Sequence, residues 1–201
     1  KAVYFGSDEM TSGAFQGEFL AKFFKDQGKT DISYLMLNGI LGQTSTTNRT
    51  ASVLKALEDN GIKATAAAAP LAADYDRATA MDMISPLLKT TKYDCIISNN
   101  DAMALGAVEA MQQQGLDPKS VPIVGIDATA DGRQAIKDGT LAMTVFQNAE
   151  GQGRASLQAA ANLIDGKPIA EGTGYEVDDE NEFIIWVPFE PVTIDNVADY
   201  D

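Results

Sequence analysis

Polar residues follow four short apolar runs of the sequence, each at the point where a strand would end. The four groups are Asn38-Gly39 after Leu35–Leu37, Ser98–Asp101 after Cys95–Ile97, Asp127 after Ile123–Ile126, and Gln147-Asn148 after Thr144–Phe146. If these runs are parallel strands of one sheet, their carboxyl ends lie on one edge, which is where α/β proteins bind ligands. The spacing therefore predicts a single binding site built from four separate loops.

The side chains of these loops suit a neutral molecule that carries many hydroxyl groups. A hydroxyl both donates and accepts hydrogen bonds, whereas Asp127 only accepts, Arg49 only donates and Asn100 does both. Hydrogen bonds to charged groups are also roughly twice as strong as neutral ones. The ring of Tyr75 can cover the apolar face of a pyranose, or it is simply the first core residue of a helix.

Each polar residue also has a purely structural interpretation. Asp101 directly precedes a helical stretch, so we interpret it as a helix N-cap rather than as a ligand-binding group. Asp127 can cap the next helix in the same way, and Asn99 or Asn100 can be turn residues. Arg49 lies within a helical stretch and can be a solvated surface charge. The binding hypothesis rests on the whole set and not on any one member.

Strands that alternate with helices must position these loops, and this order predicts an α/β fold with a parallel sheet flanked by helices. The expected strands are Ala2–Gly6, Ile32–Leu37, Lys63–Ala69, Cys95–Ser98, Pro122–Ile126, Leu141–Phe146, Gly174–Val177 and Phe183–Val187. The expected helices are Thr11–Gln27, Thr46–Asn60, one that opens at Asp74, Asp101–Gln114, Asp131–Lys137 and Glu150–Ile164. The first helix is expected to bury one apolar stripe, formed by Phe15, Phe19, Leu20, Phe23 and Phe24.

The composition excludes several classes of function. A net charge of −14 disfavours nucleic acids and anionic membranes as partners. The sequence has no histidine, which removes the Ser-His-Asp and Cys-His triads and histidine-ligated zinc. No glycine-rich phosphate loop is present, and the acidic pairs Asp8-Glu9 and Asp178-Asp179 are interpreted as solvated loop residues. We therefore expect no catalysis, no metal and no cofactor, and we expect the single Cys95 to be a buried hydrophobic residue.

Two motifs carry a resemblance to a known family. The stretch Ile96-Ile-Ser-Asn-Asn-Asp-Ala-Met-Ala-Leu-Gly-Ala-Val-Glu-Ala110, followed by Val121-Pro-Ile-Val-Gly-Ile-Asp127, resembles the periplasmic binding protein type I family, particularly its galactose/glucose-binding branch. The resemblance covers nearly the whole chain, although ribose-type binders and the effector domains of sugar-responsive repressors share the motifs. It implies a Rossmann-like lobe that binds a monosaccharide.

The resemblance also implies roles for individual residues. Asn100 and Asp127 correspond to hydroxyl-binding residues, Arg49 to their guanidinium neighbour and Tyr75 to a stacking tryptophan. Three further ligand-binding positions depart from the family pattern: glutamine replaces histidine at Gln43, serine replaces aspartate at Ser45, and glutamine replaces asparagine at Gln147. The loop Asp26–Asp31 is too short for the calcium site of this branch, so no calcium is expected there.

By the same resemblance, residues 1–146 and 188–201 form the C-terminal sugar-binding lobe. Residues 147–187 would belong to an N-terminal lobe whose first part precedes Lys1. The chain is therefore expected to need that missing lobe, or to self-associate across the surface that the lobe would cover.

The function that the resemblance implies is capture of a monosaccharide, an aldohexose such as galactose or glucose. The partner would be the permease of an ABC transporter or a chemoreceptor, in the periplasm or on the surface of a Gram-positive bacterium as a lipoprotein. No basic and apolar leader precedes the first strand, so any signal peptide is expected to have been removed or to lie outside this sequence. The alternative is an effector or sensor domain of a sugar-responsive regulator, which the sequence upstream of Lys1 would reveal.

Overall fold

The computed structural model describes residues 3–200, which form two compact units. The larger unit contains Glu9–Phe146 and residues 190–200, and the smaller contains residues 3–8 and Gln147–Phe189. Residues 3–8 were expected in the larger unit, and this part of the predicted division is wrong. Strand β1 (Tyr4–Gly6) pairs in parallel with β8 (Ile184–Trp186), so the start of the described chain belongs with the segment that begins at Gln147.

The larger unit is built on a parallel sheet in the order β3-β2-β5-β6, with β4 also paired to β2. Its strands are β2 (Asp31–Asn38), β3 (Lys63–Ala66), β4 (Leu71–Ala72), β5 (Cys95–Ser98) and β6 (Ile123–Val124). The central strand β5 is buried along its whole length, which explains its uninterrupted apolar sequence. The predicted α/β class with a parallel sheet is confirmed.

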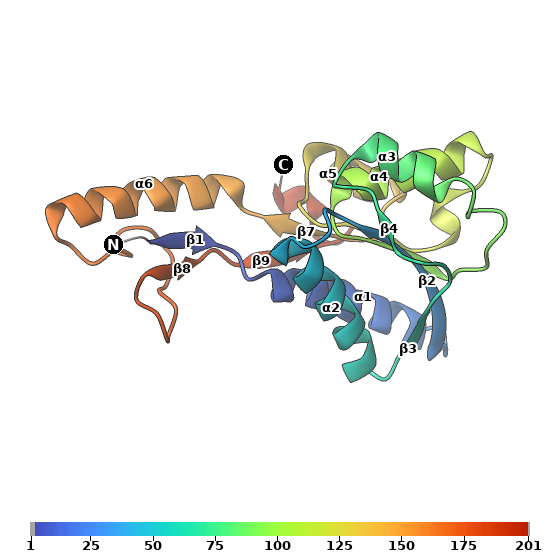
Figure 1. Ribbon diagram of the computed structural model, residues 1–201, viewed down its shortest axis with the longest axis horizontal. Coiled ribbons are helices and arrows are strands. Elements are labelled where there is room, and N and C mark those ends of the chain that lie inside the picture. The colour runs from blue at the N-terminus through green and yellow to red at the C-terminus, as the bar shows by residue number, and fades with distance from the viewer. Residues whose placement is uncertain (1–2, 201) are drawn as a thin grey trace. The chain divides into compact units, whose positions relative to one another are not determined.

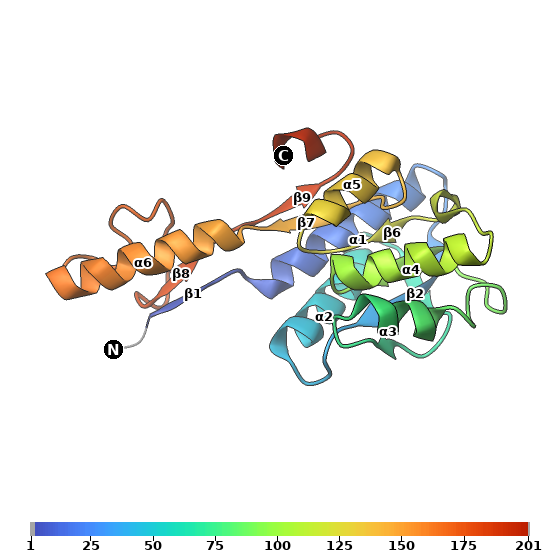
Figure 2. The ribbon, with the colours of Figure 1, turned by 90° about the horizontal axis from the view of Figure 1, so that it is seen from above.

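Helices cover both faces of this sheet, as Figures 1 and 2 show. One face is covered by α1 (Glu9–Lys25) and α2 (Thr44–Asp59), and the other by α3 (Arg77–Ile84), α4 (Asp101–Gln113) and α5 (Ala130–Asp138). Strands β7 (Thr144–Gln147) and β9 (Phe189–Val192) pair with each other at two of the three points where the chain passes between the units. Because α1 and α2 lie on one face and α4 and α5 on the other, residues from both faces can reach the same sheet edge.

Helix α1 packs on α2 through small residues more than through aromatic rings. Leu20 and Phe24 are buried as predicted, but Phe15, Phe19 and Phe23 are only partly buried. A Cβ on Gly17 would lie 2.6 Å from the carbonyl oxygen of Val53 in α2, and one on Gly13 would also collide with α2. The two backbones therefore approach closely, and a broad aromatic stripe does not fit between them.

Three local predictions need correction. Helix α3 begins at Arg77, because Asp74 and Tyr75 adopt the left-handed φ values of 54° and 64° and Asp76 caps the helix. The predicted strand Gly174–Val177 does not form in the described structure, where Val177 makes only an isolated bridge to Ile185. Strand β9 was not predicted, since Pro191 interrupts its short apolar pattern. Ala2, the predicted start of the first strand, lies outside the described residues.

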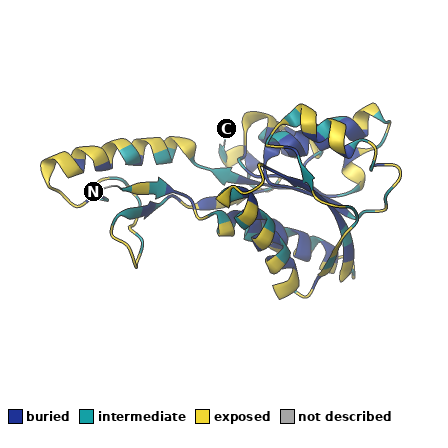
Figure 3. Cartoon of the chain, viewed as in Figure 1, coloured by how far each residue is buried: buried dark blue, intermediate teal, exposed yellow. Residues whose placement is uncertain are grey.

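The smaller unit consists of β1, β8 and the long helix α6 (Ala149–Asp165) around a small core of Ala159, Ile169 and Ile185. Much of α6 is exposed, as Figure 3 shows. Its exposed residues include the large apolar side chains of Leu157 and Ile164. Within residues 3–200, no helix combines the length and the apolar character that a membrane span needs.

Candidate ligand-binding site

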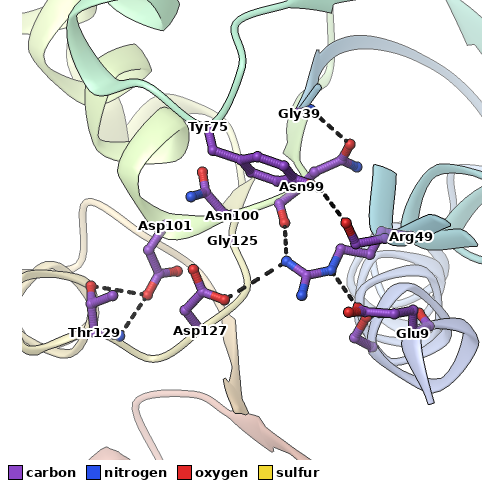
Figure 4. A network of polar contacts seen from close by, with 12 residues as sticks. Glu9, Gly39, Arg49, Tyr75, Asn99, Asn100, Asp101, Gly125, Asp127 and Thr129 are labelled. Atoms are coloured by element: carbon purple, nitrogen blue, oxygen red, sulfur yellow. Dashed lines mark hydrogen bonds and ion pairs between the residues drawn. The ribbon is translucent and has the colours of Figure 1, made fainter. Parts of the chain in front are cut away.

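The carboxyl ends of β2, β5 and β6 meet at one edge of the larger sheet, and the polar residues that follow them converge there (Figure 4). Asn99 and Asn100 come from the β5–α4 loop, Asp127 from the β6–α5 loop, and Arg49 reaches them from α2. Three of the four predicted groups therefore come together. The fourth begins at Gln147, which belongs to the smaller unit.

Arg49 lies at the centre of this cluster and is not the solvated surface charge of the alternative interpretation. Its side chain is only 6% exposed. Nε donates to Glu9 Oε2 at 2.6 Å, and Nη1 donates to the backbone oxygen of Asn99 at 2.8 Å. Nη1 also lies 3.7 Å from Asp127 Oδ1, which is an ion-pair distance but too long for a direct hydrogen bond. The guanidinium thus links α1, the β5 loop and the β6 loop.

Asp127 is held in a strained loop and does not cap the following helix. Its φ is 119° and that of Ala128 is 50°, both unusual for residues other than glycine. The cap of α5 is Thr129, whose Oγ1 accepts from Gly132 N at 3.0 Å. Burial raises the pKa of the Asp127 carboxyl to about 6, with Arg49 opposing the rise and Glu9 adding to it. Asp127 is therefore a partly exposed carboxylate that the local structure holds in an unfavourable backbone conformation.

Asn100, and not Asp101, caps helix α4. Asn100 Oδ1 accepts from Met103 N at 3.0 Å, so the N-cap interpretation of Asp101 is wrong by one residue. The Asn100 side chain is nearly buried, and its Nδ2 donates no hydrogen bond to any residue in the described part of the chain. Its acceptor is thus used by the helix, while its donor is left for a ligand.

Asp101 instead fixes the loop that follows Asp127 through buried hydrogen bonds. It is fully buried and accepts from Thr129 N at 2.8 Å, Thr129 Oγ1 at 3.2 Å and Thr144 Oγ1 at 2.6 Å. Thr144 Oγ1 in turn accepts from Ala128 N at 3.2 Å. These bonds fix both residues that follow Asp127, which explains how the loop keeps its left-handed conformation. Burial raises the pKa of Asp101 to about 7, and the charge of Asp127 adds to the rise.

This buried carboxyl predicts a pH-dependent stability that the isosteric substitution Asp101→Asn removes. An aspartate of the unfolded chain titrates near pH 4, so the folded state binds the proton more tightly and stability falls as pH rises from about 4 to 7. We expect the free energy of unfolding to drop by on the order of 3 kcal/mol over that range. Urea unfolding at pH 4 and pH 7 should show this drop in the wild type and less than half of it in the variant. An equal change of the free energy of unfolding with pH in both proteins would contradict the role of Asp101.

The ring of Tyr75 is fixed at two points. Its hydroxyl lies 2.9 Å from Ser45 Oγ and 2.8 Å from Thr46 Oγ1, both in the first turn of α2. Its ring lies against Gly39, where a Cβ would overlap it. Tyr75 precedes α3 and is not the first core residue of that helix. Ser45 thus contacts the tyrosine hydroxyl, while Gln43 is exposed at the N-terminus of α2 and makes no capping bond with its side chain.

Two residues of the cluster were not predicted from the sequence. Glu9 was interpreted as a solvated loop residue, but it begins α1 and pairs with Arg49. The spacing of Glu9, Gly13 and Gln16 on one helix face was a signal that could have located it. Asn99 is fully buried, and its Oδ1 accepts from Gly39 N at 3.1 Å, which ties the β2 loop to the β5 loop. Nothing in the sequence distinguished it from Asn100.

The chain belongs to the periplasmic binding protein domain family, whose model matches residues 1–168. The resemblance noted in the sequence is therefore confirmed at the level of the family. Members of the family are substrate-binding proteins rather than enzymes, as the missing histidine and phosphate-binding motifs indicated.

Similar proteins give this family membership a more specific context. The D-galactose/methyl-galactoside binding periplasmic protein of Haemophilus influenzae is 35% identical over 100% of this chain and 61% of its own length. The ribose import binding protein of Salmonella typhimurium is 29% identical over 83% of this chain and 53% of its own. An ABC transporter solute binding protein of Bacillus halodurans, solved with bound myo-inositol, superposes with a TM-score of 0.77 at 30% identity over 98% of this chain and 62% of its own. The chain thus spans about three fifths of the length of such relatives.

Proposed function

We propose that this chain binds a monosaccharide, an aldohexose such as galactose or glucose, at the carboxyl edge of its larger sheet. It would act as the solute-binding component of an ABC sugar transporter or a chemoreceptor system outside the cytoplasm. The observation that carries the proposal is the partly exposed acceptor Asp127 on that edge, with the buried donor Arg49 only 3.7 Å away but not hydrogen-bonded to it. The relatives named for galactosides, ribose and myo-inositol support a ligand rich in hydroxyl groups.

Each side chain of the site would make a different contact with the sugar. The Asp127 carboxylate would accept from one or two sugar hydroxyls, since charged acceptors form the stronger hydrogen bonds. The free Nδ2 of Asn100 would donate to a neighbouring hydroxyl. The Tyr75 ring, which Ser45 and Thr46 hold in place, would lie against the C–H face of the sugar. This arrangement favours a compact ring with hydroxyls on its edge over an acyclic or charged solute.

Three residues enter the proposal from the family pattern alone. Gln43 and Ser45 would line the site from the α2 end, and Gln147 from the segment that passes into the smaller unit. We further propose that the smaller unit belongs to a second lobe, so that a complete site would also use residues from that lobe. The permease or receptor would then recognise both lobes together.

A thermal-shift scan of the chain against galactose, glucose, ribose, xylose and myo-inositol tests the proposal. A ligand that binds only the native state raises the unfolding midpoint by mass action, so millimolar sugar reveals even weak binding. We expect a shift with at least one hexose and none with a charged control solute such as glutamate. The absence of a shift with every sugar would contradict sugar binding by this chain.

The ionisation of Asp127 predicts a pH dependence for sugar binding. Its raised pKa of about 6 means that the acceptor carboxylate is lost as pH falls through this value. If the sugar binds the ionised form, affinity should be constant from pH 8 to 7 and then fall by up to about tenfold per pH unit below pH 6. Isothermal titration at pH 8, 7, 6 and 5 measures this, with Asp127→Asn as the pH-independent control. Constant affinity down to pH 5 in the wild type would contradict the role of Asp127 as an ionised acceptor.

A further inference from the structure

Glu9 occupies a position that the sequence patterns of the site did not include. It is the first residue of α1, and its side chain is only 21% exposed. Its Oε2 accepts from Arg49 Nε at 2.6 Å, which is short for a charge-assisted hydrogen bond and well inside an ion-pair distance. A carboxylate this close and this shielded from water is strongly coupled to the guanidinium.

The packing of α1 on α2 fixes this pair rigidly. Gly13 lies one turn after Glu9, and a Cβ there would collide with the backbone oxygen of Arg49. The helices can be this close only because Gly13 has no side chain. Arg49 Nη1 is held at the other end by the backbone oxygen of Asn99 at 2.8 Å. With both ends bonded, the plane of the guanidinium has little freedom to rotate.

These two bonds leave the Asp127 carboxylate without a direct partner. Arg49 Nη1 stays 3.7 Å from Asp127 Oδ1, more than 1 Å further than the Glu9 bond to Nε. Within residues 3–200, no donor forms a hydrogen bond to the side chain of Asp127. A carboxylate and a guanidinium readily form a contact with two parallel hydrogen bonds. Here the bonds of Arg49 to Glu9 and to the backbone oxygen of Asn99 prevent that contact with Asp127.

We propose that Glu9 is a positioning residue of the sugar site, which holds the Arg49 guanidinium away from Asp127 so that the Asp127 carboxylate stays free to accept hydrogen bonds from a ligand. The identity of the ligand rests on the proposed sugar-binding function, whereas the arrangement of Glu9, Arg49 and Asp127 does not depend on it. Without the charge of Glu9, Arg49 would turn toward Asp127 and convert the present 3.7 Å ion pair into a direct, hydrogen-bonded contact. A sugar would then have to break that pair in order to bind.

The charges that face Asp127 all enter the prediction. Burial disfavours its ionised form, Arg49 of α2 stabilises that form and Glu9 of α1 disfavours it, while the charge of Asp127 itself raises the pKa of the buried Asp101 of α4. Glu9→Gln removes one repulsion and brings the guanidinium closer, so both changes lower the pKa of Asp127. A residue that only stabilised the fold would change the unfolding midpoint without this shift.

The test uses Glu9→Gln, with Glu18→Gln as a matched control on an exposed position of the same helix. NMR titration of the Asp127 carboxyl carbon in the free protein should show its pKa fall by about one unit in Glu9→Gln and stay unchanged in Glu18→Gln. The Nε–H signal of Arg49 should exchange faster with water in Glu9→Gln. Calorimetric titration with the sugar found in the thermal scan should show affinity at pH 7.5 fall about three- to tenfold in that variant alone.

The NMR measurement needs no ligand, so it separates this inference from the proposed function. A lowered pKa of Asp127 together with faster Arg49 exchange supports the positioning role even if no sugar binds. An unchanged pKa and an unchanged Arg49 signal in Glu9→Gln overturn it, whatever the sugar affinity of the wild type. So does a sugar affinity that falls equally in Glu9→Gln and Glu18→Gln, because a general charge effect would then account for the loss.

Discussion

Replacing Asp127 with alanine should weaken sugar binding by about 10–100-fold, which corresponds to the loss of about 1.5–3 kcal/mol from hydrogen bonds to a charged group. The substitution removes the acceptor that the strained loop presents at the sheet edge, and Arg49 remains bonded to Glu9 and Asn99. Because Asp127 is ionised only against the cost of its burial, we expect its loss to leave the fold intact or slightly stabilised above pH 6. Calorimetric titration and urea unfolding of the same preparation measure both effects.

A matched control for this variant is Asp131→Ala, which removes an exposed aspartate of the neighbouring helix α5. Among the described residues, Asp131 pairs with the partly exposed Arg77 alone, so its removal should change neither sugar affinity nor stability by a measurable amount. Unchanged affinity in Asp127→Ala would show that the assignment of the acceptor is wrong.

Replacing Arg49 with alanine should lower the free energy of unfolding by about 3 kcal/mol as well as abolish measurable sugar binding. The change leaves Glu9 and the backbone oxygen of Asn99 without their donor in a shielded position, and it leaves two carboxylates facing each other. Breaking a buried ion pair is costly because the remaining charge has no compensation. Equilibrium urea unfolding, followed by circular dichroism, gives the change in midpoint at constant slope.

Lys55→Ala provides the comparison within the same helix. Lys55 and Asp59 form an exposed ion pair in α2, with side chains 66% and 57% exposed. Water screens such an exposed pair, so its loss should shift the midpoint only slightly. If Arg49→Ala and Lys55→Ala were equally stable, the Glu9–Arg49–Asn99 network would not hold the site together.

Much of the fold could be predicted because the sheet is parallel and buried. The strands β2 and β5 carry apolar runs that end at polar loops, and the helix α2 between them ends at the Asn60-Gly61 stop that the sequence shows. This pattern was sufficient to predict that Asn100 and Asp127 come together. The boundary expected at Gln147 came from the family resemblance and not from this pattern, and the structure begins a segment of the smaller unit at the same residue.

What could not be predicted depends on contacts between distant segments. The pairing of β1 with β8 joins residues that are far apart in the chain, and no local pattern encodes it. The role of Glu9 in the site could not be predicted from the sequence. Its side chain is shielded only because α1 packs closely on α2 through Gly13. Asp101 was misassigned because a cap and the first helical residue look alike in sequence, and only the bonds of Asn100 to Met103 N and of Asp101 to Thr129 tell them apart.

NMR mapping of the sugar contact tests the central claim most directly. Titration of the isotope-labelled chain with the hexose identified by the thermal scan should shift the backbone signals of residues 98–101 and 126–129 and the Nε–H signal of Arg49. Signals of the exposed far end of the sheet, at Lys63–Ala66 in β3, should not move. If the largest shifts fell elsewhere, or if the signals of Arg49 and Asp127 did not move while the sugar bound, the carboxyl edge of this sheet would not be the sugar site.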